Sequence, residues 1–298
     1  MVQLENNRVE IIGSQTLIHG ECLSVMGKLE DKSVDLIFAD LPYGTTNCKW
    51  DSIIPLNKHM IVDNEVLYEN EYIMKMCRDG NSYFESSEIF NSESLDGLWQ
   101  HYERVIRDNG AILLFAQTPF DKILGSSNLN LLRYEWIWEK TQATGHLNSK
   151  KMPMKAHENI LVFYKKLPTY NPQKTEGHRP INNYTKYIST QNNTEIYGKV
   201  SKEISGGGDT SRFPRSVQVF SSDKQKCKLH DTQKPVELLE YLIKTYTNEG
   251  DLVLDNCSGS FSTLVACQNT NRNGIGIEMD ENYYNIGVER VRNNIKVD

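Results

Sequence analysis

Short apolar runs alternate with amphipathic stretches along most of this 298-residue chain. The first clear run, Ser33–Ala39, ends at Asp40 and a Leu-Pro-Tyr-Gly turn, which is the pattern of a buried strand followed by a loop. Similar runs predict strands at 111–116, 133–138, 157–164, 251–255 and 274–278. The Asn109-Gly110 pair predicts a turn, and helical spacing predicts helices at 98–107, 235–246, 261–268 and from 281 onward. This alternation is typical of an α/β protein with a mainly parallel sheet covered on both faces.

Two polar segments interrupt the pattern. Residues 57–97 form a polar excursion, of which Asp63–Asp96 holds nine acidic and two basic residues. Residues 166–228 form a second polar segment, rich in Asn and with three consecutive glycines. Its composition indicates an insertion rather than part of the core sheet.

Charge is unevenly distributed along the chain. The net charge is −6, but residues 140–228 hold 16 Lys and Arg against 6 Asp and Glu. A basic block within an acidic protein favours a polyanion as partner, although a solvated basic face would give the same count.

Composition excludes several classes of protein. A hydrophobic fraction of 38% and a charged fraction of 24% are not those of collagen-like, coiled-coil or wholly disordered chains. No apolar run reaches the length of a membrane helix, and the N-terminus lacks the pattern of a signal peptide, so we expect a soluble cytoplasmic protein with no membrane partner. The six cysteines are scattered without a C-x-x-C pair, so we expect neither a disulfide scaffold nor a metal site.

A βαβ unit near the C-terminus is a candidate nucleotide site. Glu278 ends its second strand, where an acid typically accepts hydrogen bonds from ribose hydroxyls. The turn at 256–260 has a single glycine, and the Asp255 carboxylate would repel phosphate. A nucleoside with a cationic tail, such as S-adenosylmethionine, fits better than a dinucleotide, and an ordinary solvated βα turn remains an alternative.

Asp40-Leu41-Pro42-Tyr43-Gly44 is a candidate reacting site. It follows a predicted strand at the carboxyl end, where open α/β sheets bind their ligands. An acid, a main-chain carbonyl and an aromatic ring together suit an exocyclic amine on a flat base. The same residues also favour a plain strand-ending turn.

Taken together, the motifs resemble those of DNA amino-methyltransferases of the permuted β class, most similar to the adenine-N6 enzymes. Asp40–Tyr43 resembles the family's D-P-P-Y, and Asp255–Ser260 resembles its D-P-F-x-G-S cofactor loop. Gly20–Leu23 resembles G-D-C-L, and Thr232–Pro235 matches T-Q-K-P. The reacting-site motif precedes the polar block and the cofactor loop, which is the circularly permuted order. The matches span 16–56, 98–165 and 212–290.

The resemblance implies a Rossmann-like sheet that uses S-adenosylmethionine to methylate a flipped-out adenine in double-stranded DNA. It divides the chain into a catalytic half (1–165, with the excursion 57–97), a target-recognition region (166–228) and a cofactor-binding half (229–298). It implies that Asp40 and the Leu41 carbonyl accept the two amine hydrogens and that Tyr43 stacks on the base. The implied catalytic residues are Asp40, Leu41, Pro42 and Tyr43. The implied cofactor-binding residues are Glu21, Cys22, Asp40, Thr232, Lys234, Asp255, Cys257, Gly259 and Glu278.

For contact with DNA we expect Lys150, Lys151, Arg212 and Arg215. The two arginines are candidate guanine readers, with phosphate contact or structural pairing as the alternative. The resemblance leaves open a homodimer and a companion restriction endonuclease, in a bacterial or phage-encoded system.

Three positions depart from the family pattern. Leu41 replaces a proline but still supplies a main-chain carbonyl, and Glu21 replaces Asp with a longer side chain. Phe261 stands where the family usually has glycine, which predicts either crowding of the cofactor or a different loop path.

Other functions compete with adenine methylation. Cytosine-N4 methylation needs the same two acceptors, but that group commonly has Ser in place of Asp40. Methyltransferases for RNA bases or protein amides favour Asn there and usually place the cofactor loop first. A DNA-binding module with a decayed fold would not be expected to retain Asp40, Tyr43, Lys234 and Glu278.

Overall fold

A computed structural model describes residues 7–43, 54–62, 65–69, 72, 75, 78–80, 88–89, 94–182, 184–187, 203–222 and 233–294. The chain forms two compact units. The first comprises residues 1–171 and 216–298, and the second comprises residues 172–215. No helix in the described ranges is long and apolar enough to span a membrane.

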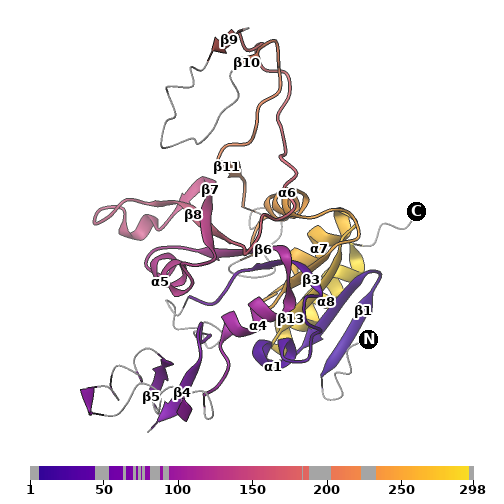
Figure 1. Ribbon diagram of the computed structural model, residues 1–298. Helices are drawn as coiled ribbons and strands as arrows, with labels where there is room; N and C mark the ends of the chain where they lie inside the picture. Colours follow the sequence, from indigo (N-terminus) through magenta and orange to yellow (C-terminus); the bar gives the residue numbers. More distant parts are fainter. Residues whose placement is uncertain are drawn as a thin grey trace. The chain divides into compact units, whose positions relative to one another are not determined.

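A nine-stranded mixed sheet organises the first unit (Figure 1). In spatial order its strands are β1 (Arg8–Ile12), β2 (Gln15–His19), β13 (Asn273–Glu278), β12 (Leu252–Asp255), β3 (Val34–Ala39), β6 (Ile106–Ala116), β8 (Lys155–Phe163), β7 (Leu132–Thr144) and β11 (Val217–Phe220). The five strands from β2 to β6 are parallel, as are β7 and β11. Strand β8 is antiparallel to both neighbours, and β1 is antiparallel to β2. The predicted α/β class with a mostly parallel sheet is confirmed.

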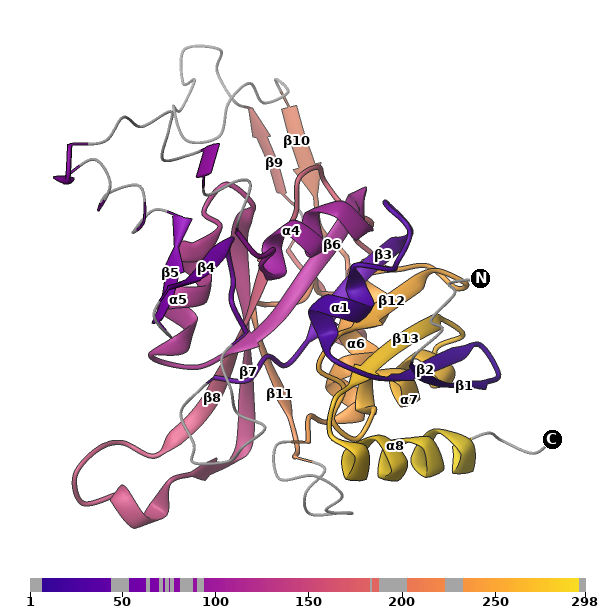
Figure 2. The same ribbon diagram turned by 90° about the horizontal axis from the view of Figure 1, so that it is seen from below.

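Helices cover both faces of this sheet because the strands alternate apolar residues between the faces (Figure 2). Ile37 and Ala39 of β3 pack with α1 (Cys22–Met26), α4 (Leu98–Val105) and α5 (Phe120–Ser127). Leu36 and Phe38 face α6 (Val236–Tyr246) and α7 (Ser262–Asn269). Helix α8 (Glu281–Asn293) packs with α7 and the β1–β2 edge.

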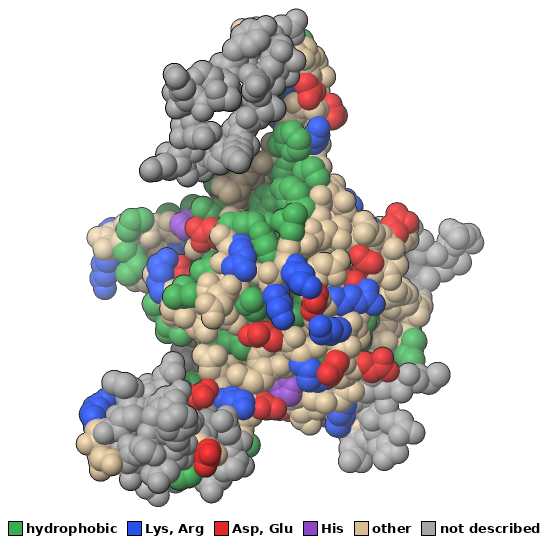
Figure 3. Space-filling view, in the orientation of Figure 1, with side chains coloured by type: hydrophobic (Ala, Val, Ile, Leu, Met, Phe, Trp, Pro, Cys, Tyr) green, Lys and Arg blue, Asp and Glu red, His purple; other side chains and the backbone are tan. Residues whose placement is uncertain are grey.

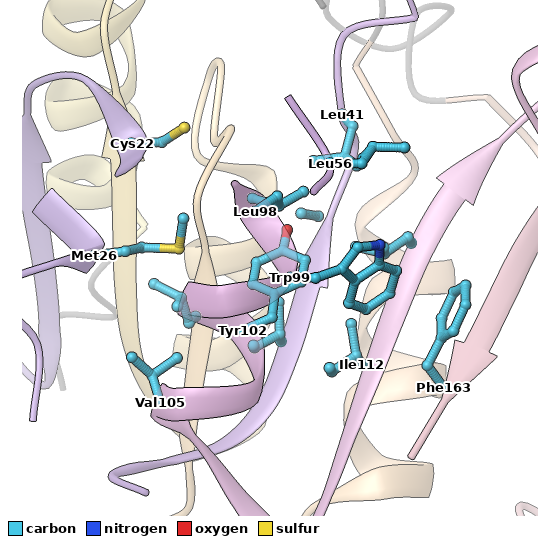
Figure 4. Packing of buried hydrophobic residues seen from close by; sticks show 14 of the residues in the cluster. Cys22, Met26, Leu41, Leu56, Leu98, Trp99, Tyr102, Val105, Ile112 and Phe163 are labelled. Carbon is cyan, nitrogen blue, oxygen red and sulfur yellow. The ribbon is translucent and has the colours of Figure 1, made fainter. Parts of the chain in front are cut away.

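Helix α4 carries the largest side chains of the core on the face of the sheet that α1, α4 and α5 cover (Figure 4). Trp99 and Tyr102 are both almost fully buried and meet edge to face, with ring centroids 5.8 Å apart. The Tyr102 hydroxyl donates a 2.6 Å hydrogen bond to Asn256 Oδ1 in the turn after β12. The helix thereby connects the core to the predicted cofactor loop.

Several elements differ from the prediction at the edges of the sheet. The β1–β2 hairpin, α5 and β11 were not predicted, and the turn predicted at Asn109-Gly110 is wrong. Strand β6 continues through this pair, and Val34↔Ile106 is followed by Leu36↔Ala111, so extra residues of β6 bulge from the ladder. Gly110 is needed there because a Cβ atom would lie 2.8 Å from the Asp35 carbonyl oxygen. Pro235 is the N-cap of α6 rather than its first helical residue.

The described parts of the polar segments contain two small hairpins. In the excursion, β4 (His59–Val62) pairs with β5 (Glu65–Tyr68). In the second unit, β9 (Tyr184–Tyr187) pairs with β10 (Glu203–Gly206). That unit is narrower than the expected region 166–228, since β11 belongs to the main sheet.

Candidate active site

The candidate residues follow four neighbouring parallel strands. Asp40 follows β3, Asp255 ends β12, Glu278 ends β13, and Glu21 comes two residues after β2. The registers Leu254↔Ile37, Asp255↔Gly276 and Glu278↔His19 align the carboxyl ends of these strands. The sheet therefore brings the reacting-site motif and the cofactor motifs to one edge, where ligands of open α/β sheets bind.

A single cavity of about 600 Å³ opens at this edge, within the range of about 300–1,000 Å³ that is usual for small-molecule sites. It is lined by eleven of the predicted residues, namely Glu21, Cys22, Asp40, Leu41, Pro42, Tyr43, Lys234, Asp255, Cys257, Gly259 and Glu278. The two motifs thus share one space, as methyl transfer between two ligands requires.

Two carboxylates shape the cofactor end of the cavity. Glu278 accepts hydrogen bonds from the main-chain N–H groups of Gly259 (2.7 Å) and Asp280 (2.8 Å). Asp255 accepts from the Cys257 N–H (3.1 Å) and the Thr263 hydroxyl (2.6 Å). Burial raises the pKa of both groups, that of Asp255 to about 7. A cation in the cavity would favour the ionised form of Asp255, so this end suits a ribose beside a positively charged group.

Phe261 does not crowd this end. It is the N-cap of α7 with φ 57°, in the left-handed region that a glycine would adopt without strain. Its ring is fully buried, 6.0 Å from the Tyr284 ring and close against Gly276 and Gly287, where a Cβ atom would collide with it. The ring therefore packs into the core rather than into the cavity, so the expected crowding of the cofactor does not occur.

Glu21 and Cys22 begin the short helix α1. The Glu21 carboxylate caps that helix by accepting from the N–H groups of Leu23 (2.9 Å) and Ser24 (2.7 Å). Cys22 is buried. Both residues line the cavity, and the longer Glu side chain folds back onto its own helix.

Asp40 lies at the centre of the reacting end. Its Oδ1 accepts a 2.9 Å hydrogen bond from the Tyr43 hydroxyl, and its Oδ2 lies 2.8 Å from Lys234 Nζ. Burial raises the pKa of Asp40, with Lys234 acting in the opposite direction and Glu158 adding to the rise. A carboxylate has about four lone-pair positions, so acceptor capacity remains for a ligand.

Two charged residues of this site were not predicted. Glu158 Oε2 lies 3.0 Å from Lys234 Nζ, and Glu158 Oε1 lies 2.6 Å from Lys140 Nζ. Burial opposes ionisation of Glu158, but the two lysines lower its pKa to about 2. The pKa of Lys234 is raised, because attraction to Asp40 and Glu158 outweighs its burial. The result is a buried chain of alternating charges, Asp40–Lys234–Glu158–Lys140.

A signal for Glu158 was present in the sequence. The run HENILVFY predicts a buried strand, and a carboxylate at its start requires a partner because an isolated buried charge is costly. The identity of that partner depends on a fold that joins Lys140 and Lys234 across about 100 residues.

Aromatic rings pack around the reacting end of the cavity. Phe38 and Phe115 stack on each other with centroids 5.4 Å apart, and both are buried beneath the cavity surface. Tyr43 stacks on Phe120 at 5.1 Å and is only partly buried. Its ring is the one that could also contact a flat aromatic ligand.

The four residues expected to contact DNA do not line the cavity. Lys150 and Lys151 are exposed in the β7–β8 connection. In the second unit, Arg212 donates hydrogen bonds to the carbonyls of Asp209 (3.0 Å), Ser211 (2.8 Å) and Arg179, so its guanidinium ties that unit together. These hydrogen bonds are of the kind that the structural-pairing alternative predicts. Arg215 is exposed, and Thr232 lies outside the described residues.

Comparison with known proteins shows the family of this chain. The family model described as "DNA methylase" matches residues 34–289. The type II methyltransferase M.HpaI of Haemophilus parainfluenzae is 28% identical over 283 residues, covering 93% of this chain and 74% of the relative. The DNA adenine methyltransferase YhdJ of Escherichia coli K12 is 28% identical over 289 residues, covering 93% and 83%.

Solved structures share the fold. The cytosine-N4-specific PvuII DNA methyltransferase has a TM-score of 0.57 at 14% identity, covering 95% of this chain and 86% of its own. The M1.HpyAVI–SAM complex has a TM-score of 0.54 at 19% identity, covering 93% and 98%. With most of the chain inside the family model and both motifs on one cavity, this chain belongs to the DNA methylase family and is an S-adenosylmethionine-dependent DNA methyltransferase.

Proposed function

We propose that this protein methylates the N6 amine of adenine at a specific sequence in double-stranded DNA. The observation that carries the proposal is the position of Asp40 on the same cavity as Asp255 and Glu278. Asp40 rather than Ser at the start of the motif favours adenine over cytosine-N4, as does the similarity to a relative named as a DNA adenine methyltransferase.

The cofactor end fits S-adenosylmethionine by the chemistry of its acids. Glu278 would accept hydrogen bonds from ribose hydroxyls, and Asp255 would face the positively charged amino-acid part. Glu21 and Cys22 would border the adenine. When bound, the cofactor supplies a methyl group on a sulfonium that needs no further activation.

Asp40 and Leu41 orient the amine of the target base. An adenine amine is a weak nucleophile because its lone pair is delocalised into the ring. When Asp40 and the Leu41 carbonyl accept its two hydrogens, the nitrogen becomes pyramidal and its lone pair turns towards the cofactor end. Positioning of this kind supplies much of a rate enhancement. As the nitrogen becomes positive, Asp40 takes its proton.

Lys234 and Tyr43 hold Asp40 in place for this role. Each occupies one position on a different carboxylate oxygen, which leaves acceptor capacity for the amine. The partly buried ring of Tyr43 would stack on a base extruded from the duplex, and extrusion costs a few kcal/mol.

The basic residues outside the cavity are proposed to bind the DNA duplex. Lys150, Lys151 and Arg215 are exposed and would contact phosphates, giving an affinity that falls with salt. Residues 166–228, with the second unit at their centre, are proposed to read the target sequence. The bacterial relatives named type II methyltransferases support a cytoplasmic enzyme with a companion restriction endonuclease. A homodimer remains a proposal.

The test is to express the protein in a methylation-free bacterial host and analyse the digested DNA. We expect N6-methyladenine at one sequence, which long-read modification mapping would identify. N4-methylcytosine alone would refute the adenine assignment while leaving the DNA methyltransferase activity intact.

A further inference from the structure

The connection between β7 and β8 forms an exposed hairpin tip. Fourteen consecutive residues, 144–157, are exposed to solvent. Strand pairing runs regularly from Tyr134↔Val162 to Glu139↔His157 and resumes after a register shift at Thr144↔Lys155. Figure 2 shows this hairpin projecting beyond the neighbouring strands. It contains one short turn of helix, His146–Asn148.

The tip carries three large apolar side chains that the described residues leave substantially exposed. Leu147 is 88% exposed, Met152 is 54% exposed and Met154 is 41% exposed. Neighbouring apolar residues of this size on an exposed loop are unfavourable in water and usually mark a contact surface.

The charges around these side chains indicate the partner. Lys150, Lys151 and Lys155 lie among them, and no acidic residue occurs between Glu139 and Glu158. Blue and green side chains are mixed on this hairpin at the left of Figure 3. Lysines that flank an apolar tip are complementary to nucleic acid, in which phosphates surround stacked bases. Architectural proteins insert Leu, Met or Phe between base steps in this way.

The root of the hairpin belongs to the cavity wall. Lys140, Gln142 and Thr144 of β7 line the cavity, as does Glu158 of β8. Leu147 lies only three residues beyond Thr144, so the apolar tip begins at the rim of the cavity. A duplex that delivers a base to Asp40 would meet this tip beside the extruded nucleotide.

We propose that Leu147, supported by Met152, inserts into the duplex and fills the space left by the extruded base. This inference rests on the proposed function, since it requires a base to leave the duplex. The insertion stabilises the opened duplex and thus favours extrusion. Insertion of Leu147 therefore raises the rate of methylation only on a duplex in which the target base is paired and stacked.

The test compares Leu147→Ala with wild type on two duplexes that carry the mapped target sequence. In one the target base is correctly paired, and in the other it is mispaired, which lowers the cost of extrusion. We expect kcat/KM to fall about tenfold or more on the paired duplex and less than about twofold on the mispaired one. With 2-aminopurine at the target position, the fluorescence increase on binding should also be smaller in the variant.

Leu129→Ala is the matched control. Leu129 is 67% exposed and lies before β7, at the end opposite the tip. It should behave as wild type on both duplexes. An equal loss on both duplexes, or no loss on either, would overturn the wedge while methylation by the wild type upheld the proposed function. Absence of methylation by the wild type on any duplex would instead refute the proposed function.

Discussion

Replacing Glu158 by Gln tests the buried charge chain beside Asp40. Lys234 Nζ lies 2.8 Å from Asp40 and 3.0 Å from Glu158, so the two carboxylate oxygens are no more than about 5.8 Å apart. At an effective dielectric constant of about 20, two charges at this distance repel by about 3 kcal/mol. That corresponds to about two pKa units. Because the Asp40 side chain is 23% exposed, solvent screening reduces the effect to about one unit.

The sign of the effect follows from the charges. Glu158 raises the pKa of Asp40, so its neutralisation lowers that pKa and Asp40 becomes a weaker proton acceptor. We expect the acid limb of the kcat profile to move about one unit to lower pH and kcat at neutral pH to fall several-fold. The dissociation constant for S-adenosylmethionine should stay unchanged, because Glu158 lies at the reacting end.

The assay measures kcat between pH 5 and 9 with tritiated cofactor and saturating DNA. Glu135→Gln is the control, since Glu135 lies exposed on β7 and outside the cavity lining. Breaking a buried ion pair also lowers stability, by about 3 kcal/mol, so rates are compared at a temperature where both variants are folded. An acid limb that stays in place, or moves to higher pH, would refute the coupling between Glu158 and Asp40.

Four further predictions follow from the site and its loop. Asp40→Ala should bind S-adenosylmethionine normally in calorimetry but lose at least about 100-fold in methyl transfer, since Asp40 addresses the base; near-normal turnover would contradict this mechanism. Glu278→Ala should raise the cofactor dissociation constant about tenfold or more, and an unchanged constant would remove Glu278 from the cofactor site. Because burial raises the pKa of Asp255 to about 7, cofactor affinity should weaken by up to about tenfold per unit as the pH falls below 7 and Asp255 gains a proton. Calorimetry over about 3 pH units, from about 5.5 to 8.5, would measure the cofactor dissociation constant at each pH. A dissociation constant that does not change with pH would argue against contact between Asp255 and the cationic part of the cofactor. Phe261→Ala should lower the free energy of unfolding in urea by about 3 kcal/mol. Phe261→Gly should be the less harmful by about 1 kcal/mol, because glycine adopts the left-handed backbone without strain; the reverse order would contradict the strain.

The sequence predicts best where function and fold depend on local order. Asp40, Asp255 and Glu278 each end a short apolar run, and parallel strands bring such ends to one edge. Their position at the carboxyl ends of strands could therefore be predicted from the apolar runs, whereas their shared cavity was what the family resemblance implied. For Phe261 the sequence left two alternatives open, crowding of the cofactor or a different loop path. The position of its ring depends on contacts with Gly276 of β13 and Gly287 of α8, which the local sequence does not reveal.

The sequence predicts secondary structure least well at the edges of the sheet and where strand pairing between distant segments decides the backbone path. Strands β1 and β11 are short and largely exposed, so their apolar signal is weak. The Asn109-Gly110 pair has the composition of a turn, but pairing with β3 and β8 keeps the chain in the sheet and converts the turn into a bulge. Tertiary pairing outweighs local preference here.

The charge chain also bears on how a permuted sequence forms one site. Lys234 lies two residues before α6, the first helix after the inserted region, whereas Asp40 follows β3 and Glu158 lies in β8, both before that region. A lysine buried between two carboxylates is stable only when all three are assembled, because any one of them alone would be a desolvated charge. Correct docking of the two halves of the chain is therefore coupled to correct ionisation of Asp40. This coupling gives a physical reason for a lysine beside the reacting carboxylate, even though the positive charge of Lys234 lowers the pKa of Asp40. The negative charge of Glu158 offsets part of that effect, and Asp40 is therefore still able to accept a proton.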